Sequence, residues 1–453
     1  MIRKKTNKKS GQVLTIVCLC LSTTFYGCGN TSECFTNMIL PNKKIISEQK
    51  HTELISKGRD KIEYLNKDGS KTIYLYSSPI LTDNGEEIDL SLIKNIENKR
   101  IEQGFNYVTK ENNIKTYFSD NPCEKGFLIT NGKIEMQVYI ESDNKSTQIH
   151  NPEDMKNIYD KPVNALQYHY PSNQNISAYS SQFGLSIETD IIPGEYMNYM
   201  VDIRECIVET NCPEYVIFKH NTSDKVVAII YAPFAKVGSG IVLGKLEVSE
   251  LDESHFLIKS IMDSSVLENS KNARIRTCQS FYLYTSKQPD STVYENIETT
   301  NSYLSQFMFT GAKNSKGQSQ TYVRFEQLEN IEIKSDDIIS AKYYVHSLVS
   351  TTSKAALCAY PVVDDWCSFA VDWTIRARPD KTKEIKPKIL NSKDYEFDIT
   401  EMLKIWIDNR GVKNVAYSIR NGIVLINSNP KSDEVLASND NGSYGTVLVL
   451  NVK

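Results

Sequence analysis

Short runs of apolar residues, several of them alternating with polar residues, dominate the chain after residue 60. Ile134–Ile140, Val226–Tyr231 and Phe281–Tyr284 are typical of these runs. Alternation with a period of two residues is typical of a β-strand that buries one face. The pairs Asp68-Gly69 and Asn131-Gly132 lie between such runs and favour tight hairpin turns. The pattern therefore predicts a mainly antiparallel β-protein.

The last third of the chain continues this pattern and adds one helix. Ile338–Val345, Val371–Trp373 and Thr446–Val452 are predicted strands. Asp398 is a suitable N-cap, and Glu401 three residues later completes a capping box. One apolar face follows, made of Met402, Leu403, Trp406 and Ile407, and the turn Asn409–Gly411 supplies a left-handed residue that ends the helix.

Composition changes along the chain suggest its domain organisation. Residues 28–60 are polar and rich in Lys and Asn, which is typical of a tether. The polar, Pro-containing stretch after Phe281–Tyr284 is a poor strand former and marks a boundary. We therefore expect two β-sandwich or jelly-roll-like domains, at 61–285 and 286–453, the second with the short helix.

The N-terminus has the features of an export signal. Five cations precede the apolar stretch Val13–Leu21, which is too short to span a bilayer. Gly27-Cys28 resembles the end of a bacterial lipobox, which implies cleavage after residue 27 and lipidation of Cys28. The alternative is a buried helix. The prediction is a lipoprotein-type signal peptide at 1–27 and a protein anchored at the extracellular face of the membrane, or secreted.

Charge and composition exclude several classes of protein. The chain has 453 residues, with 52 Lys+Arg against 56 Asp+Glu, and its mean hydropathy of -0.40 is that of an ordinary globular protein. No dense Lys/Arg cluster is identified outside the first ten residues, so nucleic acid is not an expected partner. Loss of residues 1–27 leaves a net charge of -9, so a lipid, rather than charge, would hold the protein at an anionic membrane.

The cysteines could form disulfides or remain as thiols. Because export permits disulfides, Cys206 could pair with Cys212, and Cys358 with Cys367. The alternative is four free, buried thiols that behave as small hydrophobes. The sequence contains neither Cys-x-x-Cys nor His-x-x-x-His, so zinc is not expected. No metal or cofactor is predicted.

The features of the last third resemble the DNRLRE domain over about residues 290–453. The resemblance rests on Trp366, on Val371–Trp373, and on Phe397–Thr400 leading to a helix that carries Trp406. That family is a jelly roll related to carbohydrate-binding modules of the disaggregatase type. The resemblance therefore implies a jelly-roll domain that binds carbohydrate.

The first β-rich region is similar to the N-terminal β-domain of wall-associated, Rhs-type bacterial surface proteins. Asn66–Leu92 carries the order Tyr-Ser-Ser-Pro, Asn-Gly, Ile-Asp of those domains, and Tyr231–Phe234 matches a later segment. The resemblance covers about residues 60–285 and implies a bacterial cell-surface protein. The Tyr-Asp repeats that form the large shell of that family are missing, so toxin encapsulation is not implied.

Residues near one turn form the candidate binding site. A sugar site pairs an aromatic ring with hydrogen-bonding groups, and Trp366 lies near a turn, with Tyr360 before it and Asp364 and Asp365 beside it. We expect Tyr360, Asp365 and Trp366 to bind glycan. The alternatives are a structural role for Trp366 and a solvated acidic hairpin tip that also includes Asp372. The calcium-loop pattern Asp-x-Asp-x-Asp-Gly is absent.

The sequence favours a binding protein over an enzyme. Its six histidines lie in no Gly-x-Ser-x-Gly, His-Glu-x-x-His or similar context. A glycosidase needs only two carboxylates about 5–10 Å apart, which a sequence does not reveal. We expect a non-catalytic protein that binds cell-wall or environmental polysaccharide. The alternative is a secreted polysaccharide-active hydrolase or lyase that uses its C-terminal domain as a binding module.

Overall fold

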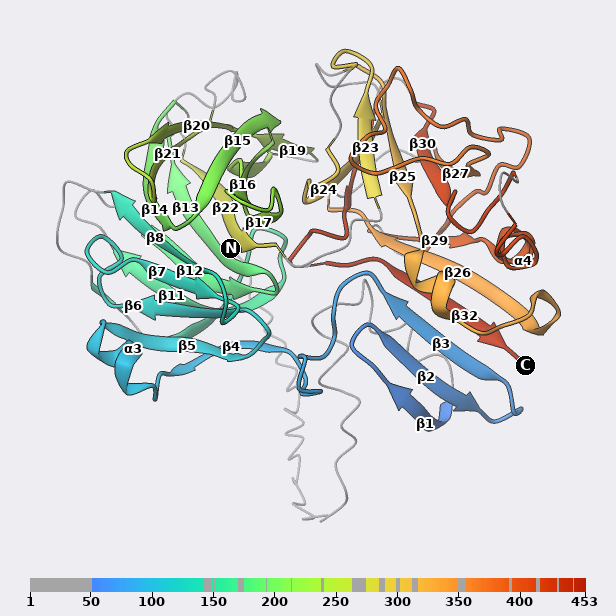
Figure 1. Cartoon of the computed structure of the whole chain (residues 1–453), viewed down its shortest axis with the longest axis horizontal. Helices are drawn as coiled ribbons and strands as arrows, with labels where there is room; N and C mark the ends of the chain where they lie inside the picture. Colours follow the sequence, from blue (N-terminus) through green and yellow to red (C-terminus); the bar gives the residue numbers. More distant parts are fainter. Residues whose placement is uncertain are drawn as a thin grey trace, which may run out of the picture.

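The structure is a computed structural model in which four sheets pack as two sandwiches (Figure 1). It describes residues 51–141, 148–149, 151–169, 175–192, 194–212, 214–237, 240–262, 274–284, 290–298, 302–311, 317–348, 356–390, 393–412, 416–429, 432–442 and 444–453. The predicted signal peptide, Cys28 and residues 28–50 of the predicted tether lie outside these ranges. Neighbouring strands pair antiparallel, which confirms the mainly β prediction. None of the described helices has the length and apolar character needed to cross a membrane.

The first sandwich consists of two large sheets. Sheet 1 contains, in spatial order, β20 (Lys245–Glu250), β21 (His255–Ile261), β14 (Tyr196–Ile203), β8 (Glu135–Glu141), β7 (Phe127–Thr130), β6 (Lys115–Ser119), β5 (Phe105–Glu111) and β4 (Asp89–Lys94), with α3 (Asn98–Glu102) between β4 and β5 in the chain. Sheet 2 contains β10 (Glu153–Lys156), β11 (Pro162–His169), β12 (Asn175–Ser181), β13 (Gly184–Ile191), β22 (Ile275–Leu283), β17 (Val226–Tyr231), β16 (Tyr215–His220) and β15 (Cys206–Cys212), joined by β9 (Gln148–Ile149), β18 (Phe234–Val237) and β19 (Gly240–Leu243).

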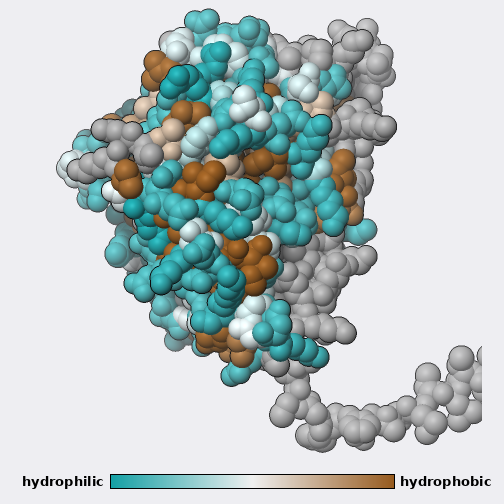
Figure 2. Space-filling view, turned by 90° about the vertical axis from the view of Figure 1, so that its right-hand side faces the viewer, coloured by the Kyte–Doolittle hydropathy of each residue, from teal (hydrophilic) through white to brown (hydrophobic). Residues whose placement is uncertain are grey.

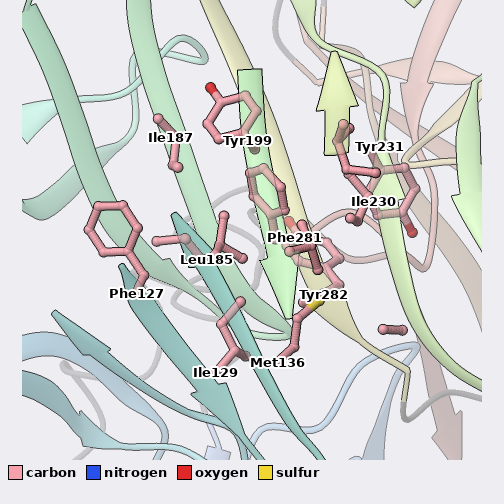
Figure 3. Packing of buried hydrophobic residues seen from close by; sticks show 14 of the residues in the cluster. Phe127, Ile129, Met136, Leu185, Ile187, Tyr199, Ile230, Tyr231, Phe281 and Tyr282 are labelled. Carbon is pink, nitrogen blue, oxygen red and sulfur yellow. The ribbon is translucent and has the colours of Figure 1, made fainter. Parts of the chain in front are cut away.

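The alternating pattern of the sequence explains how these two sheets pack. In β8, Met136, Val138 and Ile140 are buried, while the two residues between them are partly exposed. Figure 3 shows Phe127 and Met136 of sheet 1 close to Leu185 of sheet 2, within one apolar core. Burial of apolar surface between the two sheets stabilises the sandwich.

The second sandwich also has two sheets. Sheet 3 contains β1 (His51–Lys57), β2 (Lys61–Asn66), β3 (Lys71–Tyr76), β32 (Val447–Val452), β26 (Ile338–His346), β29 (Asp394–Asp398) and β28 (Lys388–Ile389). Sheet 4 contains β27 (Leu357–Pro361), β30 (Ile423–Asn427), β25 (Ser319–Val323), β24 (Phe307–Gly311), β31 (Asp433–Ala437) and β23 (Asp290–Tyr294). The helix α4 (Thr400–Asp408) lies at one end of this sandwich (Figure 1). The 3-10 helices η2 (Glu326–Asn330) and η3 (Ser335–Asp337) connect β25 to β26.

The helix α4 closes the core of the second sandwich. Its predicted apolar face is confirmed, since Met402, Leu403, Trp406 and Ile407 are all buried. Gly411 has a φ of +79° and is the expected left-handed residue. The predicted capping box is wrong: Asp398 accepts hydrogen bonds from the backbone and hydroxyl of Thr400, while Glu401 pairs with Lys404. Asp398 therefore orders the turn that precedes the helix.

The first strands of the described chain pair with the last. β3 pairs with β32 from Lys71↔Val452 to Tyr76↔Val447, and Figure 1 shows β1 to β3 beside β32 and β26. Residues 61–76, which the sequence placed at the start of the first domain, thus lie in a sheet of the second sandwich. Residues 51–57, expected in the tether, form its edge strand. Sequence order did not reveal this pairing, because the partners lie at opposite ends of the chain.

A buried contact joins the two sandwiches. Phe234 of sheet 2 and Phe307 of sheet 4 meet edge to face, with ring centroids 5.1 Å apart. Tyr159, between β10 and β11, meets Tyr444, which precedes β32, edge to face with ring centroids 6.0 Å apart. Gly442 allows a close approach, because a Cβ there would lie 2.4 Å from the hydroxyl oxygen of Tyr282. The two sandwiches therefore share a packed junction.

Candidate functional site

The segment 362–387 connects β27 to β28 and covers the outer face of sheet 4. It is held by the bridges Ala359↔Ile385 and Val362↔Pro379 and by an apolar cluster that includes Tyr322 and Val424 of the sheet beneath it. We call it the covering loop. Val371–Trp373 lies in this loop and forms no strand, so its predicted strand is wrong. Val371 is nevertheless buried, and Trp373 packs against the cluster.

Trp366 is built into this loop. Its side chain is 7% exposed, and its indole Nε1 donates a hydrogen bond to the carbonyl of Asn421 at 2.7 Å. The ring of Tyr322 lies 5.3 Å from its ring, and the guanidinium carbon of Arg324 lies 4.5 Å from the ring centroid. These contacts favour the structural alternative for Trp366.

Tyr360 has a similar environment on β27. It is 9% exposed, and its hydroxyl donates a hydrogen bond to Oε2 of Glu384 in the covering loop at 3.0 Å. Burial, together with this bond, raises the pKa of Tyr360 well above its usual value. Neither Tyr360 nor Trp366 presents an open ring face for a sugar to stack on.

Asp365 is the predicted site residue that faces solvent, with 73% of its side chain exposed. Its Oδ1 accepts hydrogen bonds from Nη2 of Arg324 at 2.9 Å and from the backbone of Trp366 at 3.0 Å. Asp364 beside it accepts two hydrogen bonds at 2.7 Å from the guanidinium of Arg378. This bond lowers the pKa of Asp364.

Asp364 and Asp365 line a groove of about 850 Å³ at the end of the second sandwich. Its other charged walls are Arg378, Arg410, Arg420 and Glu329. Nε of Arg420 donates to Glu329 at 3.0 Å, and Arg410 donates to the carbonyls of Leu328 and Ile331. We call this the charged groove. It brings guanidinium and carboxylate groups together in fixed positions.

The surface around the second sandwich is mostly polar. Figure 2 views the side of the molecule that is on the right in Figure 1, and it shows a largely hydrophilic surface on which hydrophobic residues form separate patches. A ligand for this side therefore needs hydrogen-bonding or charged groups more than a large apolar face.

A second concave region lies on the outer face of sheet 1. It has a volume of about 920 Å³ and is lined by Gln137, Tyr139, Asp202 and Arg204 among others. Burial and the charge of Asp202 raise the pKa of Tyr139. Two of its walls, Arg100 and Glu135, form an ion pair. We call this region the sheet 1 hollow, which the sequence analysis did not identify.

The four cysteines of the two predicted pairs form no disulfide. Cys206, Cys212, Cys358 and Cys367 are all unbridged. Cys206 and Cys212 begin and end the same strand β15, so the rise of about 3.3 Å per residue separates them by roughly 20 Å, far beyond the ~7 Å that a disulfide allows. The disulfide alternative is therefore wrong for this pair. The alternative of buried thiols describes Cys206, whereas Cys212, Cys358 and Cys367 are partly exposed. No group of His, Cys, Asp and Glu among the described residues could hold a metal ion.

Three carboxyl groups with raised pKa values lie inside the protein rather than in a groove. Burial raises the pKa of Glu188 and raises the pKa values of Asp290 and Glu434 to about 7. Each is at most 2% exposed, and none lines the charged groove or the sheet 1 hollow. Such shifts occur in structural networks as well as in active sites.

Comparisons with known proteins assign no family. No family model matches the chain, and a search of curated proteins finds no match. The resemblances to the DNRLRE domain and to Rhs-type surface domains stay predictions.

Proposed function

We propose that this chain is an exported, lipid-anchored bacterial surface protein that binds cell-wall or environmental polysaccharide without cleaving it. The signal-like N-terminus and Cys28 support export and anchoring. The charged groove supports binding.

The observation that carries the proposal is the fixed geometry of Asp365 in an open groove. Oδ1 of Asp365 accepts one hydrogen bond from Arg324 and one from the backbone N–H of Trp366, which fixes the position of the carboxylate. Most of the side chain still faces solvent. Groups that are already ordered lose little conformational entropy when they bind a ligand. Carboxylate and guanidinium groups together match the hydroxyls of a sugar, because one accepts and the other donates hydrogen bonds.

Our first prediction concerns Asp365. Asp365→Ala should weaken binding of the polysaccharide ligand about tenfold or more, because a hydrogen bond to a charged group contributes about 1.5–3 kcal/mol. Affinity electrophoresis against a panel of wall and environmental polysaccharides measures the change. The matched control is Asp83→Ala, which also removes an exposed carboxylate beside an arginine, Arg59.

Three outcomes separate the alternatives. Unchanged affinity of Asp365→Ala contradicts the charged groove as the site. If Tyr139→Ala abolishes binding and Asp365→Ala does not, the binding site is the sheet 1 hollow rather than the charged groove. Release of reducing ends or unsaturated sugars by the purified protein favours the hydrolase or lyase alternative.

A further inference from the structure

One half of the covering loop is strongly basic. This half, together with Lys388 at the start of β28, makes up residues 376–388, which carry six cations against two carboxylates, Asp380 and Glu384. The segment has a net charge of +4 in a chain whose net charge is -4. The six cations are all exposed: Arg376, Arg378, Lys381, Lys383, Lys386 and Lys388. We call this segment the cationic strip. It corrects the sequence analysis, which identified no dense Lys/Arg cluster here because other residues separate the cations.

Internal ion pairs use only part of this charge. Asp364 neutralises Arg378, and Glu384 lies 3.3 Å from Nζ of Lys386. Within the described part of the chain, Lys381 and Lys388 have no ion-pair partner. The strip therefore keeps a surplus of positive charge at the surface.

The strip continues into the charged groove. Arg378 belongs to both. Nζ of Lys383 lies 4.4 Å from the ring centroid of Tyr417, whose hydroxyl bonds Asp380, and Tyr417 is next to groove residues on either side, Ala416 and Ser418. In the groove itself, each acid has an arginine partner, while the guanidinium of Arg410 bonds two backbone carbonyls. Groove and strip thus form one surface with excess positive charge.

We propose that the ligand of this surface is an anionic polysaccharide, whose phosphate or carboxylate groups contact the cationic strip while its sugar units enter the charged groove. This inference rests on the proposed function and names the class of glycan. Charge complementarity carries it, since a neutral glycan gains little from a row of exposed cations whereas a polyanion releases counterions as it binds.

Two other polyanions fit the same surface less well. Single-stranded nucleic acid is held by stacking of bases on open aromatic rings, but Trp366 is buried and the guanidinium carbon of Arg376 lies 4.2 Å from the ring centroid of Trp373. An anionic membrane is flat and reaches exposed lysines, but it does not enter a concave groove of about 850 Å³. A flexible polysaccharide reaches both parts.

The second prediction tests the strip by charge removal. Lys381→Gln, Lys383→Gln, Lys386→Gln and Lys388→Gln are combined in one variant of the full chain. The matched control carries the same change at four exposed lysines elsewhere, Lys67, Lys94, Lys99 and Lys225. Both variants lose four charges, so a general effect of net charge cancels. Circular dichroism establishes that both are folded.

Binding is measured at several salt concentrations with poly(glycerol phosphate) and polygalacturonate as anionic probes and dextran as the neutral probe. We expect the wild type and the control to bind an anionic probe more tightly than dextran. The strip variant should bind it at least about tenfold more weakly and with a smaller dependence on salt.

Each other outcome overturns a distinct claim. Equal binding of dextran and the anionic probes, unchanged in the strip variant, overturns the anionic class and leaves the proposed function standing. Failure of every polysaccharide to bind overturns both. Tighter binding of single-stranded DNA, or of vesicles containing phosphatidylglycerol, than of either anionic polysaccharide overturns the inference in favour of that partner.

Discussion

At the residue scale, Trp366 shows how a residue predicted to contact a ligand can instead support the site. Its ring lies against Tyr322 and its Nε1 bonds the carbonyl of Asn421. The same residue orders Asp365 through a backbone hydrogen bond. The sequence placed Trp366 and Asp365 together at a turn, but it did not reveal the direction of the ring, because Tyr322 and Asn421 lie far away in the chain.

The third prediction concerns stability at this residue. Trp366→Ala should lower the free energy of unfolding by about 3–5 kcal/mol, because it leaves a cavity and an unpaired carbonyl at Asn421. Trp373→Ala is the control. The ring of Trp373 is partly exposed, so its removal should lower the free energy of unfolding by less. Chemical denaturation measures both. Equally small effects would mean that Trp366 is not part of the core of the covering loop.

At the element scale, the strand β15 determines the chemistry of two cysteines. Burial raises the pKa of Cys206 to about 11, and its Sγ donates to the carbonyl of Arg204. Cys212 lies at the far end of the strand. An extended strand keeps its two ends apart. The short spacing of the two cysteines in the sequence, which suggested a disulfide, therefore prevents one in the folded protein.

The fourth prediction follows from this separation. In the native protein at pH 8, iodoacetamide should alkylate Cys206 more slowly than Cys212, because the Cys206 thiol is buried and has a raised pKa, while Cys212 is partly exposed. Peptide mass spectrometry without reductant measures both rates. A peptide pair joined by a 206–212 disulfide would contradict the free-thiol assignment.

Elements with a local cause were predictable from the sequence. The helix α4 was predicted with its buried face, since that face depends on a spacing of three and four residues. The strand expected at Val371–Trp373 does not form, because this segment packs on the outside of sheet 4 and finds no partner strand. The charged groove could not be predicted from the sequence either. Its walls come from η2, the covering loop and the segment around Arg420, which are far apart in the chain and meet only in the folded protein.

At the scale of the whole molecule, the second sandwich and the junction contain acids that are costly to ionise. Burial raises the pKa of Asp290 from 3.8 to about 7, and that of Glu434 from 4.5 to about 7. Between about pH 4 and pH 7 the folded state therefore binds more protons than the unfolded state. Stability from these two groups is greatest at low pH and falls as the pH rises towards 7. Burial lowers the pKa of His346. This group therefore has the opposite effect, and its contribution to stability falls as the pH drops below about 6.5.

The fifth prediction isolates Asp290. Asp290→Asn keeps an oxygen that can accept the hydrogen bond from the backbone of Asn439, but removes the charge. It should raise the free energy of unfolding at pH 8 by about 1–4 kcal/mol relative to wild type. The gain should shrink towards zero as the pH falls to 4. Denaturation at both pH values measures the difference, and a gain that does not vary with pH would contradict the raised pKa.

The pairing of β3 with β32 has a consequence for the order of events during synthesis. β3 is made early, yet its partner β32 follows only after every strand of the first sandwich. Until those residues emerge, the hydrogen-bonding edge of β3 is open, and closing so long a loop is slow compared with pairing neighbouring hairpins. The six residues of β32 therefore complete the middle of a sheet. A chain released before they are made would retain an unpaired strand edge that can associate with other chains.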